Sequence, residues 1–125
     1  MIELEELRQR ALEKPGVSED FPFDQDTLVF KVLGKIFMLT NLEAYPSSIN
    51  LKCEPTRALE LRERYDAVKP GYHMNKKHWN TITLDGTIAD ELLLELVDHS
   101  YARVVAGLKR SERDALQGDS PLETS

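Results

Sequence analysis

Cysteine is almost absent from this sequence, whose 125 residues contain only Cys53. A single cysteine excludes an internal disulfide framework and any zinc site built from several cysteines. A reducing, cytoplasmic setting is expected for such a chain. No apolar run approaches the roughly 18 residues that a membrane-spanning helix needs, and the charged segment MIELEELRQR lacks the apolar stretch of a secretory signal. We therefore expect a protein that neither enters nor crosses a membrane.

An excess of basic charge is also missing, since 22 acidic side chains outnumber 16 basic ones and the formal net charge is -6. This balance excludes a wholly basic nucleic-acid binder. The charge is uneven, because residues 1–28 and 81–125 are acidic whereas residues 52–80 carry more basic than acidic side chains. Contacts within a Debye length could still hold a polyanion on this middle segment. On charge alone, an ordinary solvated surface explains the segment more simply.

The composition is that of a folded chain, with 41% hydrophobic and 30% charged residues. The length suits one compact unit, which we expect to span residues 1–110. Residues 111–125 are polar and acidic and contain Gly118 and Pro121. We expect this last segment to be a mobile tail.

Hydrophobic spacing predicts three helices and four strands. The predicted helices span residues 2–13, 55–65 and 88–108, and the predicted strands span residues 28–32, 35–42, 48–52 and 79–84. Leu33-Gly34 suits a two-residue turn, since glycine tolerates φ > 0, and joins the first two strands in a β-hairpin. Strands in sequence with helices at both ends predict an α+β fold, in which helices pack on one face of an antiparallel sheet.

Two connecting segments carry further expectations. Residues 18–26 are predicted to form an acidic loop that Phe21 and Phe23 dock onto the core. Thr87 precedes the last helix and has Asp90 three residues on, which predicts an N-cap there.

Three segments of the chain resemble the MmcQ/YjbR family of small bacterial proteins, which are described as DNA-binding. The segments are KPGVSEDFPFDQDTLVFKVLGKIFML at 14–39, INLKCEPTRALELRERY at 49–65, and PGYHMNKKHWNTITLDG at 70–86 followed by DHSY at 98–101. The resemblance implies a frataxin-like α+β shape, with an antiparallel sheet and helices on one face. It also implies DNA binding through a double wing of β-hairpins and their loops.

The polar segment 71–80 has the strongest claim to bind a ligand. Its lysines can contact phosphates, its amides can donate to phosphates or read base edges, and its aromatic rings can stack on bases or sugars. The candidate nucleic-acid-binding residues are Lys31, Lys35, Lys69, Tyr72, His73, Asn75, Lys76, Lys77, His78 and Trp79. Lys31 and Lys35 enter this set because they flank the Leu33-Gly34 turn, which the resemblance makes the second wing.

Ordinary structural roles compete with this interpretation. Trp79 could be a half-buried strand residue, the two histidines could cap the loop, and the lysines could keep a sheet edge soluble. Arg57 and Arg62, on the predicted second helix, are assigned to solubility. In the DHSY segment we expect packing and hydrogen bonds to the sheet or to the segment around Trp79.

Metal binding and catalysis find little support. Cys53 and the three histidines are the only soft ligands, and the His73–His78 spacing is not a recurring zinc pattern. Cys53 could be paired with His73 or His99 as nucleophile and base, but a lone cysteine at a strand end is more often a small buried hydrophobe. No glycine-rich phosphate loop or nucleophile elbow occurs. We therefore expect no cofactor, no metal and no catalytic residue.

The sequence thus predicts a monomeric DNA-binding protein without catalytic activity, whose binding is weak and sensitive to salt. An adaptor that binds a protein partner through the same aromatic and basic surface is the alternative. A frataxin-like metal chaperone is a more remote one. Its carboxylates would be Glu3, Glu5, Glu6, Asp24 and Asp26.

Overall fold

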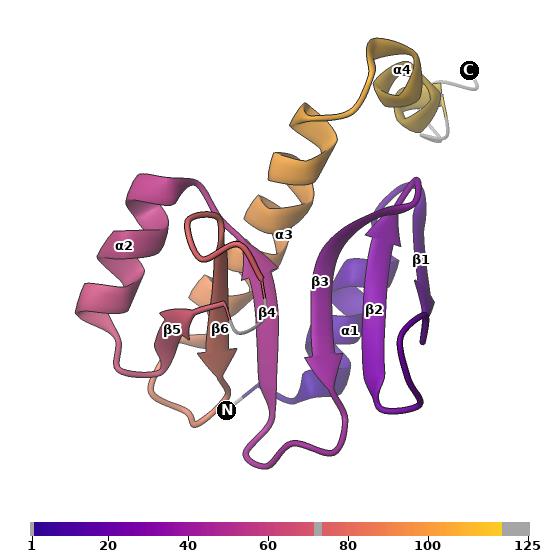
Figure 1. The fold of residues 1–125 in the computed structure, drawn as a ribbon. Helices are drawn as coiled ribbons and strands as arrows, with labels where there is room; N and C mark the ends of the chain where they lie inside the picture. The colour runs from indigo at the N-terminus through magenta and orange to yellow at the C-terminus, as the bar shows by residue number, and fades with distance from the viewer. Residues whose placement is uncertain (1, 72–73, 119–125) are drawn as a thin grey trace.

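The computed structural model describes residues 2–71 and 74–118, and Figure 1 shows their arrangement. Six strands form one sheet in the order β1-β2-β3-β4-β6-β5, and every neighbouring pair is antiparallel. The strands are β1 (Val17–Asp20), β2 (Thr27–Val32), β3 (Lys35–Asn41), β4 (Ser48–Lys52), β5 (Val68–Pro70) and β6 (Trp79–Thr83). The helices are α1 (Leu4–Leu12), α2 (Pro55–Arg64), α3 (Asp90–Ala106) and α4 (Arg110–Gly118).

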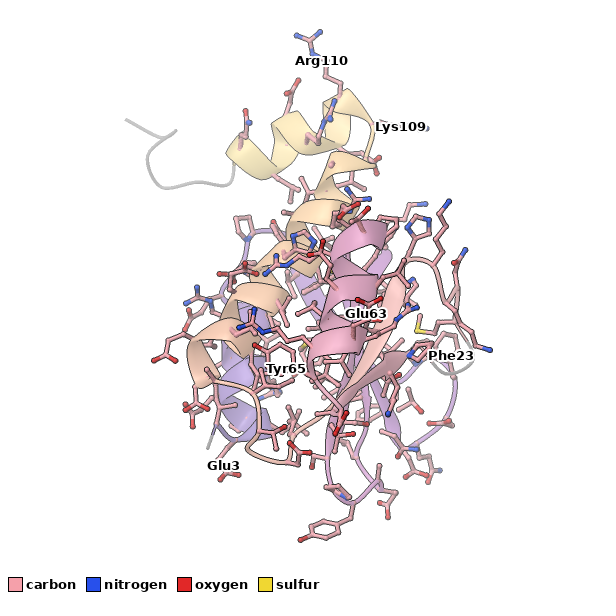
Figure 2. All side chains as sticks on the ribbon, turned by 90° about the vertical axis from the view of Figure 1, so that its left-hand side faces the viewer. Glu3, Phe23, Glu63, Tyr65, Lys109 and Arg110 are labelled. Carbon is pink, nitrogen blue, oxygen red and sulfur yellow. The ribbon has the colours of Figure 1, made fainter. Side chains whose placement is uncertain are left out.

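Helices cover one face of this sheet. The long helix α3 packs on β3 and β4, α1 lies beside α3 and contacts β1, and α2 contacts β5 and β6. In the side view of Figure 2, α1 and α3 lie on one side of the strands and Phe23 lies on the other. The predicted α+β fold with helices on one face is confirmed. Within the described ranges no helix is long and apolar enough to cross a bilayer.

Strand alternation divides the side chains between the two faces of the sheet. Ile49 and Leu51 of β4 and Ile82 of β6 are buried in the main core beneath the helices. Their neighbours Asn50 and Thr81 therefore point to the opposite face, which carries no helix within residues 2–71 and 74–118. We call this second face the open face.

The β2–β3 hairpin forms as predicted. Leu33 and Gly34 have φ of 47° and 84°, which is the double positive φ of a tight hairpin turn. A bulge follows, because the pairing shifts between Phe30 and Lys31. The shift leaves Phe37 without a partner of its own in β2 and buries it together with Met38.

Ser100 of α3 closes the sheet between β3 and β4. These strands share only two register pairs, Met38 with Leu51 and Leu39 with Asn50. Beyond them, the Ser100 hydroxyl accepts from Lys52 N at 2.9 Å and donates to Phe37 O at 2.5 Å. The residue is 0% exposed, so the hydroxyl replaces a pair of ladder bonds in the interior.

The neighbours of Ser100 in α3 tie that helix to the N-terminal segment. Asp98 accepts a bidentate pair of bonds from Arg10 at 2.9 and 2.6 Å and a third bond from Lys14 at 2.5 Å. The Arg10 bonds hold the pKa of Asp98 below its usual range. Tyr101 donates to Pro15 O at 2.7 Å and meets the Phe37 ring edge-on. These contacts fix α1 against α3.

His99 connects α3 to the start of α2. Its Nε2 accepts from Glu54 N at 3.1 Å, so this nitrogen carries no proton in the folded state. Glu54 is the N-cap of α2, and its carboxylate accepts from Thr56 N and Arg57 N. The DHSY segment therefore contacts the sheet as expected, together with α1 and the α2 cap, and no bond to the Trp79 segment is among them.

Several predicted elements need correction. Residues 17–20 form the edge strand β1 rather than part of an acidic loop, because their backbone pairs with β2. Residues 68–70 form the short strand β5 on β6. Phe21 and Phe23 do not dock on the core, since they are 45% and 66% exposed.

The last third of the chain also departs from expectation at both ends of α3. Thr87 is not the N-cap, because its N and Oγ1 bond to Asp85 and the cap position is Ala89. Residues 110–118 form α4 instead of a tail, and Leu116 is buried there against Gly16, which Leu33 also approaches. The remainder of the predicted tail, residues 119–125, lies outside the described residues.

We expect Ser100→Ala to lower the free energy of unfolding by about 2–4 kcal/mol, because it strands a buried N–H and a buried C=O between β3 and β4. Chemical denaturation would measure the loss. Ser111→Ala, at an exposed serine of α4, is the matched control and should change stability little. Equal stability of the two variants would contradict the bridging role.

His99 should make stability dependent on pH. Burial, with a smaller effect of the Arg57 charge, lowers the pKa of His99. A lowered folded-state pKa means that its contribution is complete above the ordinary histidine pKa of about 6.5 and is lost as pH falls through the lower folded value. Unfolding free energies should therefore drop less between pH 7.5 and 5 in His99→Gln, which cannot titrate, than in the wild type. An unchanged pH slope would argue against this link.

Candidate nucleic-acid interface

The two loops singled out from the sequence begin at the same end of the sheet. Both β3 and β6 run antiparallel to β4, so β3 and β6 point the same way. The 33–34 turn precedes β3, and residues 74–78 of the 71–78 loop precede β6; both lie at the upper end of the sheet in Figure 1. Segments some forty residues apart in sequence thus lie at the same end of the sheet, with β4 between their strands.

This arrangement collects lysines, and most of them are solvent-exposed. Lys35 follows the turn, Lys76 and Lys77 lie in the 71–78 loop, and Lys69 lies on β5. None of these four forms an ion pair within the described part of the chain. Lys31 is half-buried and lies 3.8 Å from the Asp20 carboxylate. Two further candidates, Tyr72 and His73, lie outside the described residues.

Arg62 of α2 holds the 71–78 loop in place. Its guanidinium donates to Asn80 Oδ1 at 2.6 Å, to Trp79 O at 3.2 Å and to Lys76 O. Asn80 is buried and donates in turn to Ala58 O. The sequence pattern assigns Arg62 to solubility. It does not reveal the structural role, because the partners of Arg62 lie 14 to 18 residues away in the chain.

The loop is also organised by its own residues. The Asn75 side-chain oxygen Oδ1 accepts a hydrogen bond from Lys77 N at 2.9 Å, and the Asn75 main-chain carbonyl accepts from His78 N and Trp79 N. His78 O accepts from Cys53 N at 2.7 Å, which ties the loop to the end of β4. The lysine backbone is therefore positioned by a fixed turn rather than by the lysine side chains themselves.

Trp79 is largely covered. It is 8% exposed, and register pairs it with Lys52 on the open face, outside the main core. Gly71 packs so closely that a Cβ there would lie 2.7 Å from Trp79 Cβ. Little of the indole is left for stacking, whereas Asn75, Lys76 and Lys77 are exposed.

A hollow of about 610 Å³ lies on the open face, bordered by the β1–β2 connection and the 71–78 loop. Its floor comes from β3, β4 and β6, and its walls include Phe23 of the β1–β2 connection and Met74 of the 71–78 loop. The lining residues are Phe23, Asp24, Thr27, Ile36, Leu39, Asn41, Ser48, Asn50, Met74 and Thr81. Sequence reasoning missed this hollow, because five separate segments contribute to it.

Neither a metal-ligand cluster nor an activated cysteine is found among the described residues. No three His, Cys, Asp or Glu side chains among them gather in a way that could hold a metal ion. Cys53 is 3% exposed, and burial raises the pKa of its thiol. A thiol in that state is a poor nucleophile.

We expect Arg62→Ala to loosen the 71–78 loop, because three acceptors lose their shared donor and Asn80 Oδ1 is buried. Amide hydrogen exchange at residues 74–79 should accelerate, and the unfolding free energy should fall by about 1–3 kcal/mol. Arg64→Ala, at an exposed arginine of the same helix, is the matched control. Equal exchange rates in both variants would mean that Arg62 does not hold the loop.

Known proteins share this fold and sequence. The YjbR family model matches residues 12–103. The chain is 40% identical to the uncharacterized protein YbdF of Escherichia coli O157:H7, over 87% of this chain and 89% of that protein, and 35% identical to the uncharacterized protein YjbR of E. coli K12, over 90% and 96%. The crystal structure of Deinococcus radiodurans protein DR2400 superposes with a TM-score of 0.86 at 45% identity, covering 91% of this chain and 87% of that one. The chain therefore belongs to the YjbR family, as its three sequence segments predict.

Proposed function

We propose that this protein binds DNA without catalysing a reaction, and that it contacts the phosphate backbone with the 71–78 loop and the β2–β3 hairpin. The observation that carries the proposal is that Lys35, Lys76 and Lys77 lie at the same end of the sheet, are exposed and form no ion pair in the described chain. Lys31 and Lys69 extend the same surface. Lysine ammonium groups on preformed turns suit phosphate contacts.

The charge of the whole chain sets the strength of such binding. A net charge of -6 opposes long-range attraction of a polyanion, so only contacts within a Debye length favour the complex. About three phosphate contacts give a slope of about -3 in log K against log salt. We therefore expect weak binding that disappears at moderate ionic strength.

Exposed apolar side chains favour a second candidate, an adaptor that binds a protein partner. Phe21 and Phe23 project from the β1–β2 connection with 45% and 66% of their surface exposed. Trp79, which the sequence offered for such contacts, is mostly covered. An adaptor of this kind would depend on the phenylalanines and respond little to salt.

The test is a fluorescence anisotropy titration of a labelled 20-base-pair duplex at 25 and 150 mM salt. We expect Lys76→Ala/Lys77→Ala to weaken binding about tenfold or more at low salt and to reduce the salt slope by about 2, because two phosphate contacts are lost. Neither lysine side chain bonds to another residue among 2–71 and 74–118, so folding should be preserved. Circular dichroism would verify this.

Arg64→Ala is the control for a lost positive charge, since Arg64 is the C-terminal residue of α2 and does not belong to either lysine-bearing loop. It should bind as the wild type does. Affinity that is independent of salt, or equal in the double variant and the wild type, would refute phosphate contact by this surface.

A further inference from the structure

We infer that the hollow on the open face receives an unpaired nucleobase, so that the preferred ligand is a single strand rather than a duplex. The inference rests on the proposed function and deepens it, because it assigns the strand state of the nucleic acid and a site for the base. It is carried by the geometry, the lining chemistry and the charge of the hollow.

The geometry follows from three rows of side chains that cross the open face. The row nearest the 33–34 turn consists of two separate pairs, Lys31 with Ile36 and Lys52 with Trp79. The middle row contains Val29, Leu39, Asn50, Thr81 and Lys69. The far row contains Thr27 and Asn41 of β2 and β3, and Ser48 paired with Thr83. The hollow lies over the middle and far rows and reaches Ile36 of the first.

Its lining combines apolar contact with hydrogen-bonding groups. Leu39 and Ile36 form an apolar floor, and Met74 and the exposed ring of Phe23 stand at its borders. A flat aromatic base needs such surfaces on its two faces. A volume of about 610 Å³ lies within the range of small-molecule sites.

Polar groups inside the hollow match the edges of a base. Asn50 donates one N–H to Leu39 O and accepts from Thr81, which leaves its second N–H without a partner in the described chain. The Asn41 amide N–H groups and the Ser48 hydroxyl are likewise unpartnered within residues 2–71 and 74–118. These donors and the hydroxyl can bond to base carbonyls and ring nitrogens.

Positive and negative side chains lie at opposite ends of the hollow, as the phosphate and the base of a nucleotide require. Lys31 and Lys52 lie in the row at one end of the hollow, and Lys76 and Lys77 follow Met74 at its border. Asp24 lies at the opposite end, where bonds from Thr27 N and Asp26 N lower the pKa of its carboxyl. A phosphate is attracted to the lysine end, and the exocyclic amine of adenine or cytosine can donate to the carboxylate.

Duplex DNA cannot use this site, because its bases are paired and stacked inside the helix. Recognition of single strands usually combines a basic track with surfaces that accept splayed bases. The open face, with lysines at one end and the hollow beside them, provides both. The 71–78 loop and the 33–34 turn then bind the phosphate backbone of the strand, while the hollow on the sheet binds the base.

The experiment compares a labelled 15-nucleotide strand of adenine and cytosine, its duplex with the complementary strand, and the free mononucleotides AMP and CMP, by anisotropy and competition at low salt. We expect the single strand to bind at least about tenfold more tightly than the duplex and the mononucleotides. Phe23→Ala should weaken single-strand binding about tenfold, Phe23→Tyr should restore it, and duplex binding should be unchanged by either.

The matched control is Tyr45→Ala, which removes an aromatic ring that is 97% exposed but does not line the hollow. It should bind the strand as the wild type does. Equal or tighter duplex binding, or an unaffected Phe23→Ala variant, would overturn the base site while leaving salt-sensitive duplex binding to support the proposed function. Mononucleotides that bind as tightly as the strand would also overturn it. If neither the single strand, nor the duplex, nor the mononucleotides bind in a salt-sensitive way, the proposed function is refuted.

Discussion

A buried hydroxyl joins the two halves of this sheet. Strands β1, β2 and β3 form one half and β4, β6 and β5 the other, and their backbones share only two register pairs. Ser100 bridges Phe37 O and Lys52 N beyond one end of that short ladder, and Thr40 donates to Ser48 O near the other end. Since each loop of the candidate interface belongs to a different half, this joint determines how the two sets of lysines lie relative to each other.

The candidate interface is supported from behind by residues that take no part in it. Arg62 reaches from α2 to the carbonyls of Lys76 and Trp79, and Gly71 allows Trp79 to pack closely on the chain. The exposed lysines therefore extend from a turn whose backbone is already held, which lowers the conformational entropy lost on binding.

Local patterns in the sequence predicted the elements that they encode. Alternating apolar residues and Leu33-Gly34 identified the β2–β3 hairpin, and helical spacing identified α3. Strand β1 escaped detection because Ser18, Glu19 and Asp20 are polar and become a strand only by pairing with β2. Helix α4 and the hollow were not predicted from the sequence for a related reason. Leu116 finds its partners near residues 16 and 33, and the hollow gathers side chains from five segments.

The narrow joint between β3 and β4 has a mechanical consequence. Backbone ladders resist shear between strands, and here much of that resistance falls on side-chain hydroxyls instead. The hollow straddles the joint, since Leu39 lies on one side of it and Asn50 on the other. The Ser100 bonds therefore connect α3, on the opposite face, to the joint over which the hollow lies. Substitutions in that helix that remove the Ser100 bonds can therefore alter the shape of the hollow without changing any residue that lines it.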